Sequence, residues 1–362
     1  LRSRHDAVLL AVGLSRSRGL PLENADHPDT WLALPFLQAV RLGPQPEVPD
    51  RVTVVGGGNV AVDVARSAMR LGASSVKMVC LENEEEMPAW DWECREALEE
   101  GIDILHRLGP DKIMVEDGDI TGLRTKEVER VFDENGNFAP TYNEDRLTTV
   151  DCEMVVLAIG QHEDLDLVEE TDVRQQKKGL LEFDHSTMST SQEGIFAAGE
   201  VVTGPGSAIE AVANGHRASD AVLAYLRTGE LQPVPEEEPE PVGELDEEVA
   251  ENIKRIKRIA MPTLSPEERR KSFAQFELGY GEEEALQEAR RCLSCTAGAS
   301  VEDERCAACV TCMRVCPFGV PAIDDVAYMT SEMCQSCGLC AVECPTRCIS
   351  IERFYSVGSI TE

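Results

Sequence analysis

The chain of 362 residues carries 67 acidic residues against 34 Lys and Arg, a formal charge of −33 at pH 7. This charge argues against nucleic acid or an anionic membrane surface as the main partner, because both would repel the protein. The length allows two or three domains, and a hydrophobic fraction of 42% is enough for ordinary cores. The 14 cysteines crowd into the last quarter of a chain that is too long for a disulfide-stapled miniprotein.

The longest apolar runs, such as residues 154–159, fall far short of the roughly 20 residues that span a membrane. The apolar run 7–12 follows basic residues but precedes no small-residue cleavage site, so we expect a buried strand rather than a signal peptide. We therefore expect a cytoplasmic protein with reduced thiols, which favours metal ligation over disulfides. Because the chain opens on Leu1 and directly on a strand, we also expect a natural N-terminal portion before it.

In chain order, residues 1–45 predict one strand and a proline-containing loop, and residues 51–160 alternate strand and helix patterns as in βαβ units. The strand 52–55 runs into a glycine-rich turn, and the helix after it has one apolar face and stops at Gly72. The turn reads G-x-G-x-x-A in the strand–turn–helix context of a dinucleotide site. We predict that the phosphates sit at the positive helix end, on Gly56, Gly58, Asn59, Val60 and Ala61.

The next predicted strand, residues 76–81, ends in Glu82, which lies 24 residues after Gly58. A carboxylate at this position accepts hydrogen bonds from the ribose hydroxyls of NAD and repels the 2′-phosphate of NADP. No Arg follows directly, so the sequence predicts NADH rather than NADPH. The alternative is that Glu82 is one more exposed acid in an acidic run.

A second nucleotide site is predicted where the strand 194–198 stops at a Gly–acid pair and residues 204–207 open a helix that runs to about Leu226. In flavoproteins of the disulfide-reductase type, such a strand places an acid on the ribityl chain of the flavin. The helix N-terminus then faces the pyrimidine edge of the ring. We predict FAD contacts from Gly160, Gly199, Glu200, Gly206, Ser207 and Ala208.

Segments 6–13 and 154–160 resemble the paired strands that lead into and out of an inserted NAD domain. The FAD domain needs a glycine-rich βαβ unit of its own, but the single fingerprint lies in the NAD domain, so the first FAD segment is either upstream or absent. The predicted boundaries are a partial FAD domain (1–45), an NAD-binding domain (46–164), the returning FAD segment (165–232), an acidic linker with helices (233–291) and a cysteine-rich domain (292–362).

The linker at 233–252 holds nine acidic residues, four prolines and no basic residue, the composition of a solvated tether. Residues 253–291 predict helices, with Ser265 as the N-cap and Pro266 as the first helical residue of one of them. The acidic linker would favour a basic docking surface on a partner protein.

The last domain repeats one cysteine spacing, C-x2-C-x2-C-x3-C-P, which is the pattern of bacterial ferredoxins with two clusters. Three closely spaced thiolates wrap one cube, and the fourth, followed by proline, ligates the other cube. The spacing therefore predicts one [4Fe-4S] cluster on Cys306, Cys309, Cys312 and Cys344, and a second on Cys334, Cys337, Cys340 and Cys316. Zinc also binds C-x2-C pairs, but zinc binding would not explain why both runs end in Cys-Pro. Disulfides are less expected still, because the thiols are predicted to be reduced.

Six cysteines lie outside this pattern. Cys292 and Cys295 form another C-x2-C pair, which either belongs to a third cluster with ligands from elsewhere or is a pair of structural thiols. The remaining four are expected to be small buried hydrophobic residues: Cys80, Cys94, Cys152 and Cys348.

Several segments resemble the small-subunit family of glutamate synthase, a family of NAD(P)H oxidoreductases. They are residues 56–66, 86–89, 194–199, 208–215 and 288–295. The C-terminal domain is similar to longer relatives that act as electron-input modules of anaerobic redox complexes. Two departures stand out besides the missing FAD segment. Glu200 stands where relatives usually have Asp, and Cys80-Leu81-Glu82 stands where NADPH-using relatives carry an Arg pair.

The predicted fold class is therefore α/β, a disulfide-reductase-like FAD/NAD(P) fold without its N-terminal FAD segment, followed by a small α+β ferredoxin domain. The resemblance implies NADH oxidation at FAD, or NAD reduction in the reverse direction, with electrons passing through two [4Fe-4S] clusters to a partner protein or a catalytic subunit of a larger complex. No catalytic acid, base or nucleophile is nominated, because hydride transfer needs stacking and distance. The alternatives are a non-catalytic electron-relay or scaffold subunit and an electron-bifurcating module.

Overall fold

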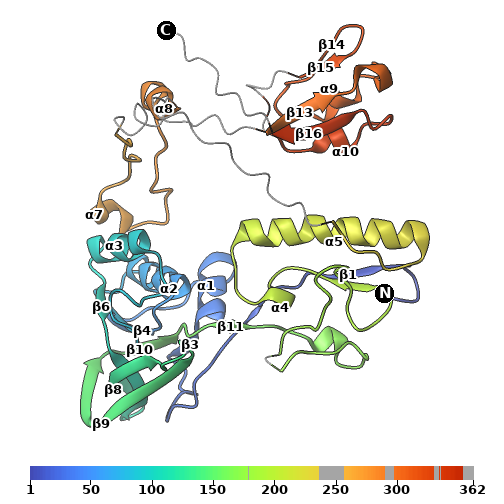
Figure 1. The fold of residues 1–362 in the computed structure, drawn as a ribbon. Helices are drawn as coiled ribbons and strands as arrows, with labels where there is room; N and C mark the ends of the chain where they lie inside the picture. The colour runs from blue at the N-terminus through green and yellow to red at the C-terminus, as the bar shows by residue number, and fades with distance from the viewer. Residues whose placement is uncertain (178, 236–256, 290–296, 330–333, 335, 354–362) are drawn as a thin grey trace. The chain divides into compact units, whose positions relative to one another are not determined.

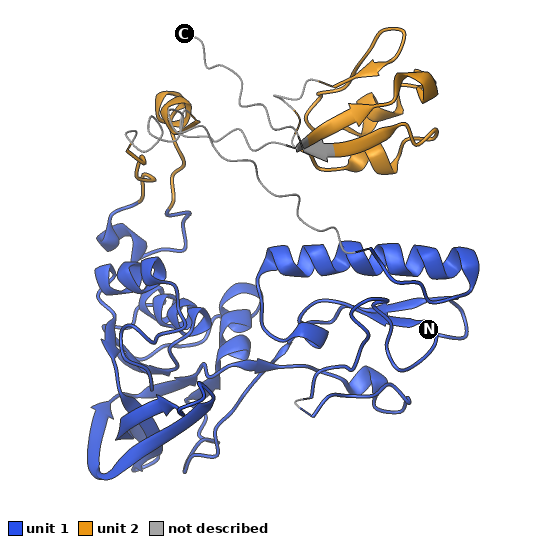
Figure 2. Ribbon diagram, in the orientation of Figure 1, with its two compact units in different colours: residues 1–238, 264–276 blue, residues 239–263, 277–362 orange. Residues whose placement is uncertain are grey.

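The computed structural model describes residues 1–177, 179–235, 257–289, 297–329, 334 and 336–353. The chain divides into two compact units (Figure 2), here called unit 1 and unit 2, and each is described separately. Unit 1 comprises residues 1–238 and 264–276, and unit 2 comprises residues 239–263 and 277–362. Within the described residues, no helix has the length and apolar character needed to cross a bilayer.

A five-stranded parallel sheet forms the middle layer of one lobe of unit 1 (Figure 1). Valine-rich strands suit this position, because parallel sheets are covered on both faces. Helix α2 (Asn59–Arg70) connects β4 to β5, and α3 (Asp91–Glu99) lies between β5 and β6. The strand order is β3 (Thr30–Leu32), β10 (Met154–Leu157), β4 (Arg51–Val55), β5 (Ser75–Val79) and β6 (Asp103–Leu105).

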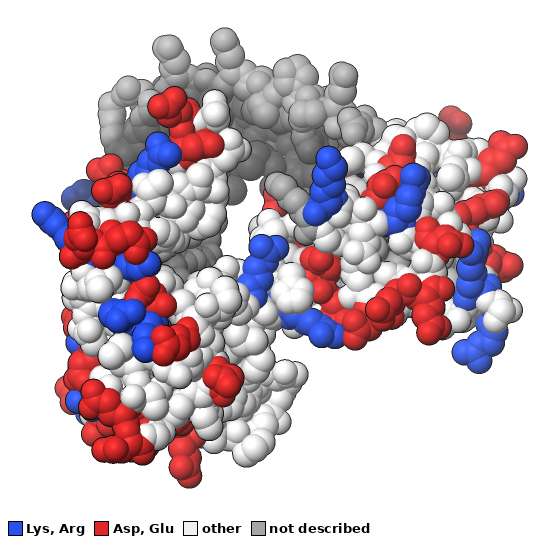
Figure 3. All heavy atoms as spheres, turned by 90° about the horizontal axis from the view of Figure 1, so that it is seen from below, with Lys and Arg blue, Asp and Glu red and all other residues white. Residues whose placement is uncertain are grey.

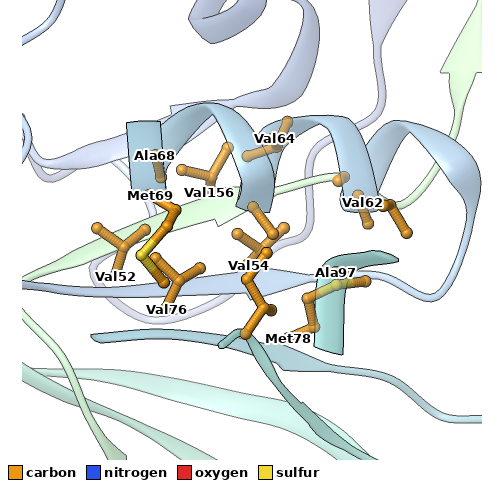
Figure 4. Close-up of a cluster of buried hydrophobic side chains, with 14 of the residues drawn as sticks. Val52, Val54, Val62, Val64, Ala68, Met69, Val76, Met78, Ala97 and Val156 are labelled. Atoms are coloured by element: carbon orange, nitrogen blue, oxygen red, sulfur yellow. The ribbon is translucent and has the colours of Figure 1, made fainter. Parts of the chain in front are cut away.

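Each face of this sheet carries its own core. On the helical face, α2 buries Val62 and Met69 against Val54 and Met78 of the strands (Figure 4), and Phe36 of α1 (Ala33–Leu42) joins the same cluster. An antiparallel three-stranded sheet supplies the residues that cover the opposite face. Its strands are β7 (Leu108–Glu116), β8 (Asp119–Phe132) and β9 (Phe138–Asp151).

The rest of unit 1 is built on a parallel strand pair, β1 (Val8–Leu10) and β12 (Ile195–Ala197), with α4 (Glu200–Thr203) and the long α5 (Ala208–Thr228) packed beside it (Figure 1). A short 3-10 turn, η1 (Asp166–Val168), contributes Val168 to its core. Two short antiparallel strands, β2 (Arg16–Ser17) and β11 (Gln161–His162), carry the chain into and out of the five-stranded sheet.

Segments 6–13 and 154–160, which the sequence placed at the entry to and the exit from the inserted NAD domain, do not pair with each other. The strand β1 pairs with β12, and β10 lies between β3 and β4. The predicted loop after the first strand also contains helix α1. Its Pro35 is the third helical residue, where a missing N–H is tolerated because the first-turn N–H groups have no partner inside the helix.

Residues 264–276, here called the strap, pack on α2 and α3. The strap begins at Leu264, and Ser265 then caps α7 (Pro266–Arg269) with a capping box, as the sequence predicts. The ring of Phe276 lies 4.8 Å from the Arg66 guanidinium, within cation–π range. Buried Arg269 pairs with Glu99 at 2.8 Å. Outside α7 and α8 (Glu282–Ala289), the described part of 253–291 is not helical, contrary to the prediction.

Unit 2 is small and has its own core. The strand β13 (Ala297–Val301) pairs antiparallel with β16 (Ile349–Arg353), and the hairpin β14 (Ala322–Ile323)/β15 (Ala327–Tyr328) lies between them in sequence. The remaining elements are the turn η2 (Asp303–Arg305) and the short helices α9 (Thr311–Val315) and α10 (Leu339–Val342). Four of the seven buried residues in this core are cysteines.

Candidate functional site

The glycine-rich turn after β4 has the geometry of an anion site. Gly56 has φ +144°, and a Cβ there would overlap the backbone carbonyl of Ala158, so glycine is required. A Cβ on Gly58 would meet nothing within 4 Å, which leaves the approach to the helix open. Gly58 is the N-cap of α2, and no described side chain caps this helix end. Because no described side chain caps it, this helix end can bind an anion such as a pyrophosphate with its first N–H groups. Asn59, Val60 and Ala61 form the first turn.

The carboxylate of Glu82 lies beside this turn, because a Cβ built on Gly57 would stand 2.9 Å from its Oε2 atom. Asn83 and Glu86 fix the backbone that follows. The Asn83 N–H donates to Glu86 Oε2 at 3.2 Å, and the Glu86 N–H donates to Asn83 Oδ1 at 2.9 Å. Arg107 forms an ion pair with Glu86 at 3.1 Å. The guanidinium of Arg107, which lies in the loop after β6, is thus paired with an acid.

The thiol of Cys80 is buried beneath the same turn. A Cβ on Gly57 would lie 3.1 Å from Cys80 Cβ, and Cys80 Sγ lies 3.5 Å from His106 Nδ1. Burial, and then the nearby Glu82 charge, raise the pKa of the Cys80 thiol to about 12. The Cys80 thiol is therefore protonated near neutral pH and acts as a small packing residue.

A loop crosses the turn and places a tryptophan beside it. The Ala89 N–H donates to the Gly57 carbonyl at 3.1 Å, and the Trp90 N–H donates to Asn59 Oδ1 at 2.9 Å. The Trp90 side chain is 62% exposed. The resemblance singled out residues 86–89, but no pattern in the sequence identified Trp90 as part of the site.

The predicted flavin residues gather at the start of α4 and α5. Glu200 Oε1 accepts a hydrogen bond from the Gly206 N–H at 3.1 Å, and Glu200 Oε2 lies 3.8 Å from the position of a Cβ on Gly13. Gly199 has φ +77° and open space where a Cβ would stand. These residues can accept a hydroxylated chain at Glu200. Gly160, with φ +113°, lies instead at the β2/β11 crossing, where its carbonyl accepts from the Arg18 N–H.

The N-terminus of α5 carries a capping box. Ser207 Oγ accepts from the Glu210 N–H, and the Ser207 N–H donates to Glu210 Oε2 at 2.6 Å. Hydrogen bonds from the Ser207 backbone and hydroxyl lower the pKa of Glu210, so an anionic carboxylate sits at this helix end beside Ala208.

One face of α5 carries exposed apolar side chains, namely Ile209, Val212, Leu223 and Leu226.

In unit 2, the cysteines of the repeated pattern surround two cavities. One cavity is lined by Cys316, Cys334, Cys337 and Cys340. The other is lined by Cys306, Cys309, Cys312 and Cys344, together with Cys348. The structure thus brings the eight predicted ligands together in the two predicted groups, with the fourth cysteine of each run in the cavity of the other run.

The two halves of unit 2 repeat in detail at an offset of 28 residues. Ala308 and Ser336 both have positive φ, at 49° and 54°, as do Val310 and Gly338, at 57° and 76°. Left-handed backbone is costly for a β-branched residue such as Val310. The two C-x2-C-x2-C loops therefore share one unusual backbone conformation, as expected if both hold the same kind of ligand.

Backbone N–H groups also point at the sulfurs in a repeated way. The Ala327 N–H donates to Cys306 Sγ, and the Ala299 N–H donates to Cys334 Sγ, both at 3.3 Å. Such hydrogen bonds stabilise thiolates and tune iron–sulfur clusters. The two donor residues are 28 positions apart, as are the two sulfurs that they contact. The structural repeat therefore extends beyond the cysteines.

The same cysteines do not converge on a single point. Within the described ranges, no three His, Cys, Asp or Glu side chains lie close enough together to hold one metal ion. Cys292 and Cys295 lie outside the described residues. Cys80, Cys152 and Cys348 are buried, as predicted, and Cys94 is partly buried.

A parallel α/β sheet with a glycine-rich turn, joined through two short strands to a second strand pair and helix, is a Rossmann-like fold of the FAD- and NAD(P)-binding class. The chain belongs to the pyridine nucleotide-disulphide oxidoreductase family, whose sequence model matches residues 2–215. The resemblance to small subunits of glutamate synthase is confirmed by the curated relatives.

Two such relatives illustrate the match. The chain is 34% identical to the beta subunit of the NADP(+)-dependent formate dehydrogenase of Moorella thermoacetica, over 82% of this chain and 43% of that protein. It is 31% identical to the small chain of the NADPH glutamate synthase of Azospirillum brasilense, over 65% of this chain and 52% of that protein. The chain thus spans about half the length of these relatives.

Among solved structures, FprA from Mycobacterium tuberculosis in complex with NADPH matches with a TM-score of 0.53 and 16% identity. The match covers 65% of this chain and 67% of FprA. At this identity the likeness concerns the fold.

Proposed function

We propose that the protein is an electron-transfer subunit that links NAD(H), FAD and two [4Fe-4S] clusters, and that it exchanges electrons with a partner protein or a catalytic subunit of a larger complex. Oxidation of NADH and reduction of NAD are both compatible with this role. One observation carries the proposal. Unit 2 has two cavities, each lined by four cysteines of the repeated pattern, and the same chain has the glycine-rich turn of unit 1.

The cluster assignment is supported by the chemistry of the cavities. Each is lined by four cysteines of the repeated pattern and receives a backbone N–H on one of their sulfurs, and the loops around it contain left-handed residues. Cys306, Cys309, Cys312 and Cys344 would hold one cluster, and Cys316, Cys334, Cys337 and Cys340 the other. When bound, such clusters accept and donate single electrons. Exposed cysteines such as Cys309 and Cys337 would need a reducing compartment such as the cytoplasm.

The nucleotide preference is proposed to be for NADH. The two curated relatives described above carry NADP(+) or NADPH in their names. In this chain, however, Glu82 stands beside the turn, and Arg107 of the adjacent loop is paired with Glu86. The Glu82 carboxylate would accept hydrogen bonds from the ribose hydroxyls and repel a 2′-phosphate. The Arg107 guanidinium, being paired with Glu86, would do little to offset that repulsion.

The flavin role is proposed from Glu200 and the N-terminus of α5. Glu200 would accept a ribityl hydroxyl, and the first turn of α5 would face the isoalloxazine edge with the Glu210 carboxylate nearby. When bound, FAD exchanges a hydride with the nicotinamide and single electrons with iron–sulfur centres. The residues present fit one end of the cofactor, and its adenosine pyrophosphate would need a further glycine-rich unit.

Cofactor content tests the proposal directly. The chain, produced anaerobically and loaded with iron and sulfide, should hold about eight irons, show a broad visible charge-transfer band and lose that band on reduction. An iron content below about four per chain, with zinc in its place, would overturn the cluster assignment. Flavin analysis of the same sample, with and without the native partner subunits, locates FAD binding.

A second candidate is a non-catalytic relay subunit. It is suggested by the two cysteine-lined cavities of unit 2, which could hold electron-carrying clusters whether or not unit 1 binds FAD. Clusters that a chemical reductant reduces but NADH does not, in the intact complex, would support the relay. Bleaching of the clusters by NADH would support the enzyme.

A further inference from the structure

The cavity lined by Cys306, Cys309, Cys312 and Cys344 contains a fifth thiol. Cys348 is 5% exposed and lines the same cavity, and its Sγ lies 3.5 Å from Cys344 Sγ. The sequence predicted Cys348 to be a packing residue, and its burial agrees with that prediction. Its position does not follow from packing alone, because an apolar side chain would fill the same space without placing a sulfur against a predicted ligand.

Among the described residues, the other cavity is lined by no such thiol. The residue that corresponds to Cys348 in the 28-residue repeat is Val320, which is also buried and lines the cavity of Cys316. Each residue stands four positions after the fourth cysteine of its run. The repeat therefore provides two corresponding positions, of which one carries a thiol and the other an aliphatic side chain.

The backbone around Cys348 favours a stable thiol position. Its carbonyl accepts a hydrogen bond from the Glu302 N–H at 2.7 Å, and the residue directly precedes β16. Cys344 lies on the turn before it, where Arg347 has φ +50° and the Arg347 N–H donates to the Cys344 carbonyl. The strand-anchored Cys348 would thus remain in the cavity if Cys344 left it.

We propose that Cys348 is a reserve ligand for the cluster in this cavity and can take the place of Cys344. The inference rests on the proposed cluster function. In the exchange, the iron–sulfur bond to Cys344 breaks and one to Cys348 forms, while the proton of the Cys348 thiol passes to the Cys344 sulfur beside it. No oxidant or reductant is required, and the net charge of the site is unchanged.

Iron and acid-labile sulfide, counted per chain after anaerobic loading of the full chain, test the proposal. The wild type and Cys344→Ala should each hold about eight irons, whereas Cys344→Ala/Cys348→Ala should hold about four. Cys316→Ala is the matched control and should hold about four irons, because Val320 cannot ligate iron. Cys344→Ser, which keeps the side-chain size, is measured in parallel to guard against a folding defect of the alanine variant.

Equal iron loss in Cys344→Ala, Cys344→Ser and Cys316→Ala would overturn the reserve role. Loss of iron in Cys348→Ala alone would also overturn it, because Cys348 would then be a primary ligand or a structural requirement. A wild type without clusters would instead refute the proposed function, so the two failures are distinguishable. Electron paramagnetic resonance of reduced Cys344→Ala should show an altered signal from one cluster only, since a changed ligand geometry alters its spin distribution.

Discussion

Glu82 is the single residue on which the proposed choice between NADH and NADPH depends. Replacing it by Gln keeps the side-chain size but removes the charge. We expect Glu82→Gln to raise the KM for NADH about 10-fold, because a charge-assisted hydrogen bond contributes about 1.5–3 kcal/mol. The KM for NADPH should fall, because the repulsion of the 2′-phosphate disappears.

Steady-state reduction of an artificial electron acceptor by the intact complex measures both constants. The matched control is Glu84→Gln, since Glu84 is an exposed acid two residues further along the same loop. An unchanged NADH to NADPH ratio in Glu82→Gln would contradict the assignment and leave Glu82 as one more surface acid.

Trp90 provides an optical signal at the same turn. Its emission overlaps the absorption of reduced nicotinamide, so NADH bound at Gly56–Ala61 should quench it by energy transfer. The chain has three tryptophans, of which Trp31 is partly buried in another strand and Trp92 lies in the first turn of α3. We expect Trp90→Phe to remove most of the NADH-dependent quenching, and Trp92→Phe to remove less.

Fluorescence titration with NADH measures the effect. NAD is the control, because it does not absorb in the range of tryptophan emission. Equal quenching in the wild type and Trp90→Phe would show that the nucleotide binds away from the loop that Ala89 and Trp90 form over the turn.

At the level of elements, the strap depends on a buried charge network. Glu100 is fully buried and pairs with Arg66 at 2.7 Å and Arg70 at 3.1 Å, and the Phe276 ring covers the Arg66 guanidinium. Removing one partner of a buried ion pair leaves uncompensated charge. We expect Glu100→Gln to lower the free energy of unfolding of unit 1 by about 3 kcal/mol.

Urea unfolding followed by circular dichroism measures this change. The control is Glu267→Gln, since Glu267 forms an exposed pair with Lys271, and its loss should cost below about 1 kcal/mol. A similar small effect for both variants would mean that the network contributes little to the fold.

The elements differ in how far the sequence predicted them. The turn at Gly56, the helix after Ser207 and the cap at Ser265 were predicted, because each depends on residues adjacent in sequence. The three-stranded sheet β7–β9 was not predicted, because residues 51–160 were expected to alternate strands and helices, whereas 108–151 form consecutive antiparallel strands. The contact between Phe276 and Arg66 was not predicted, because it joins segments far apart in sequence. The grouping of Cys344 with Cys306 was predicted across a long separation, since the chemistry of the cluster supplies the long-range constraint that hydrophobic periodicity lacks.

At the scale of the molecule, acidic and basic side chains are interspersed on the face shown in Figure 3, so the excess of acids is not confined there to one patch.

The two units should respond differently to loss of iron. The core of unit 2 consists largely of cysteines, namely Cys312, Cys340, Cys344 and Cys348 with Ala299, Ala327 and Ile349. Unit 1 has extensive aliphatic cores on both faces of its sheet.

We expect removal of iron with an oxidant and a chelator to abolish amide hydrogen-exchange protection in β13 and β16 while that of β4 and β5 is retained, because metal binding and folding are coupled in small metal domains. Mass spectrometry of peptides from the treated and untreated protein checks this. Retained protection in β13 and β16 would show that unit 2 folds without clusters.

The docking of the strap makes unit 1 discontinuous in sequence, because residues 264–276 return to helices α2 and α3. During synthesis, α2 leaves the ribosome long before Phe276, so the guanidinium of Arg66 lacks its aromatic partner until the chain has been made through residue 276. A cation–π contact is therefore among the last contacts of unit 1 that a growing chain can form.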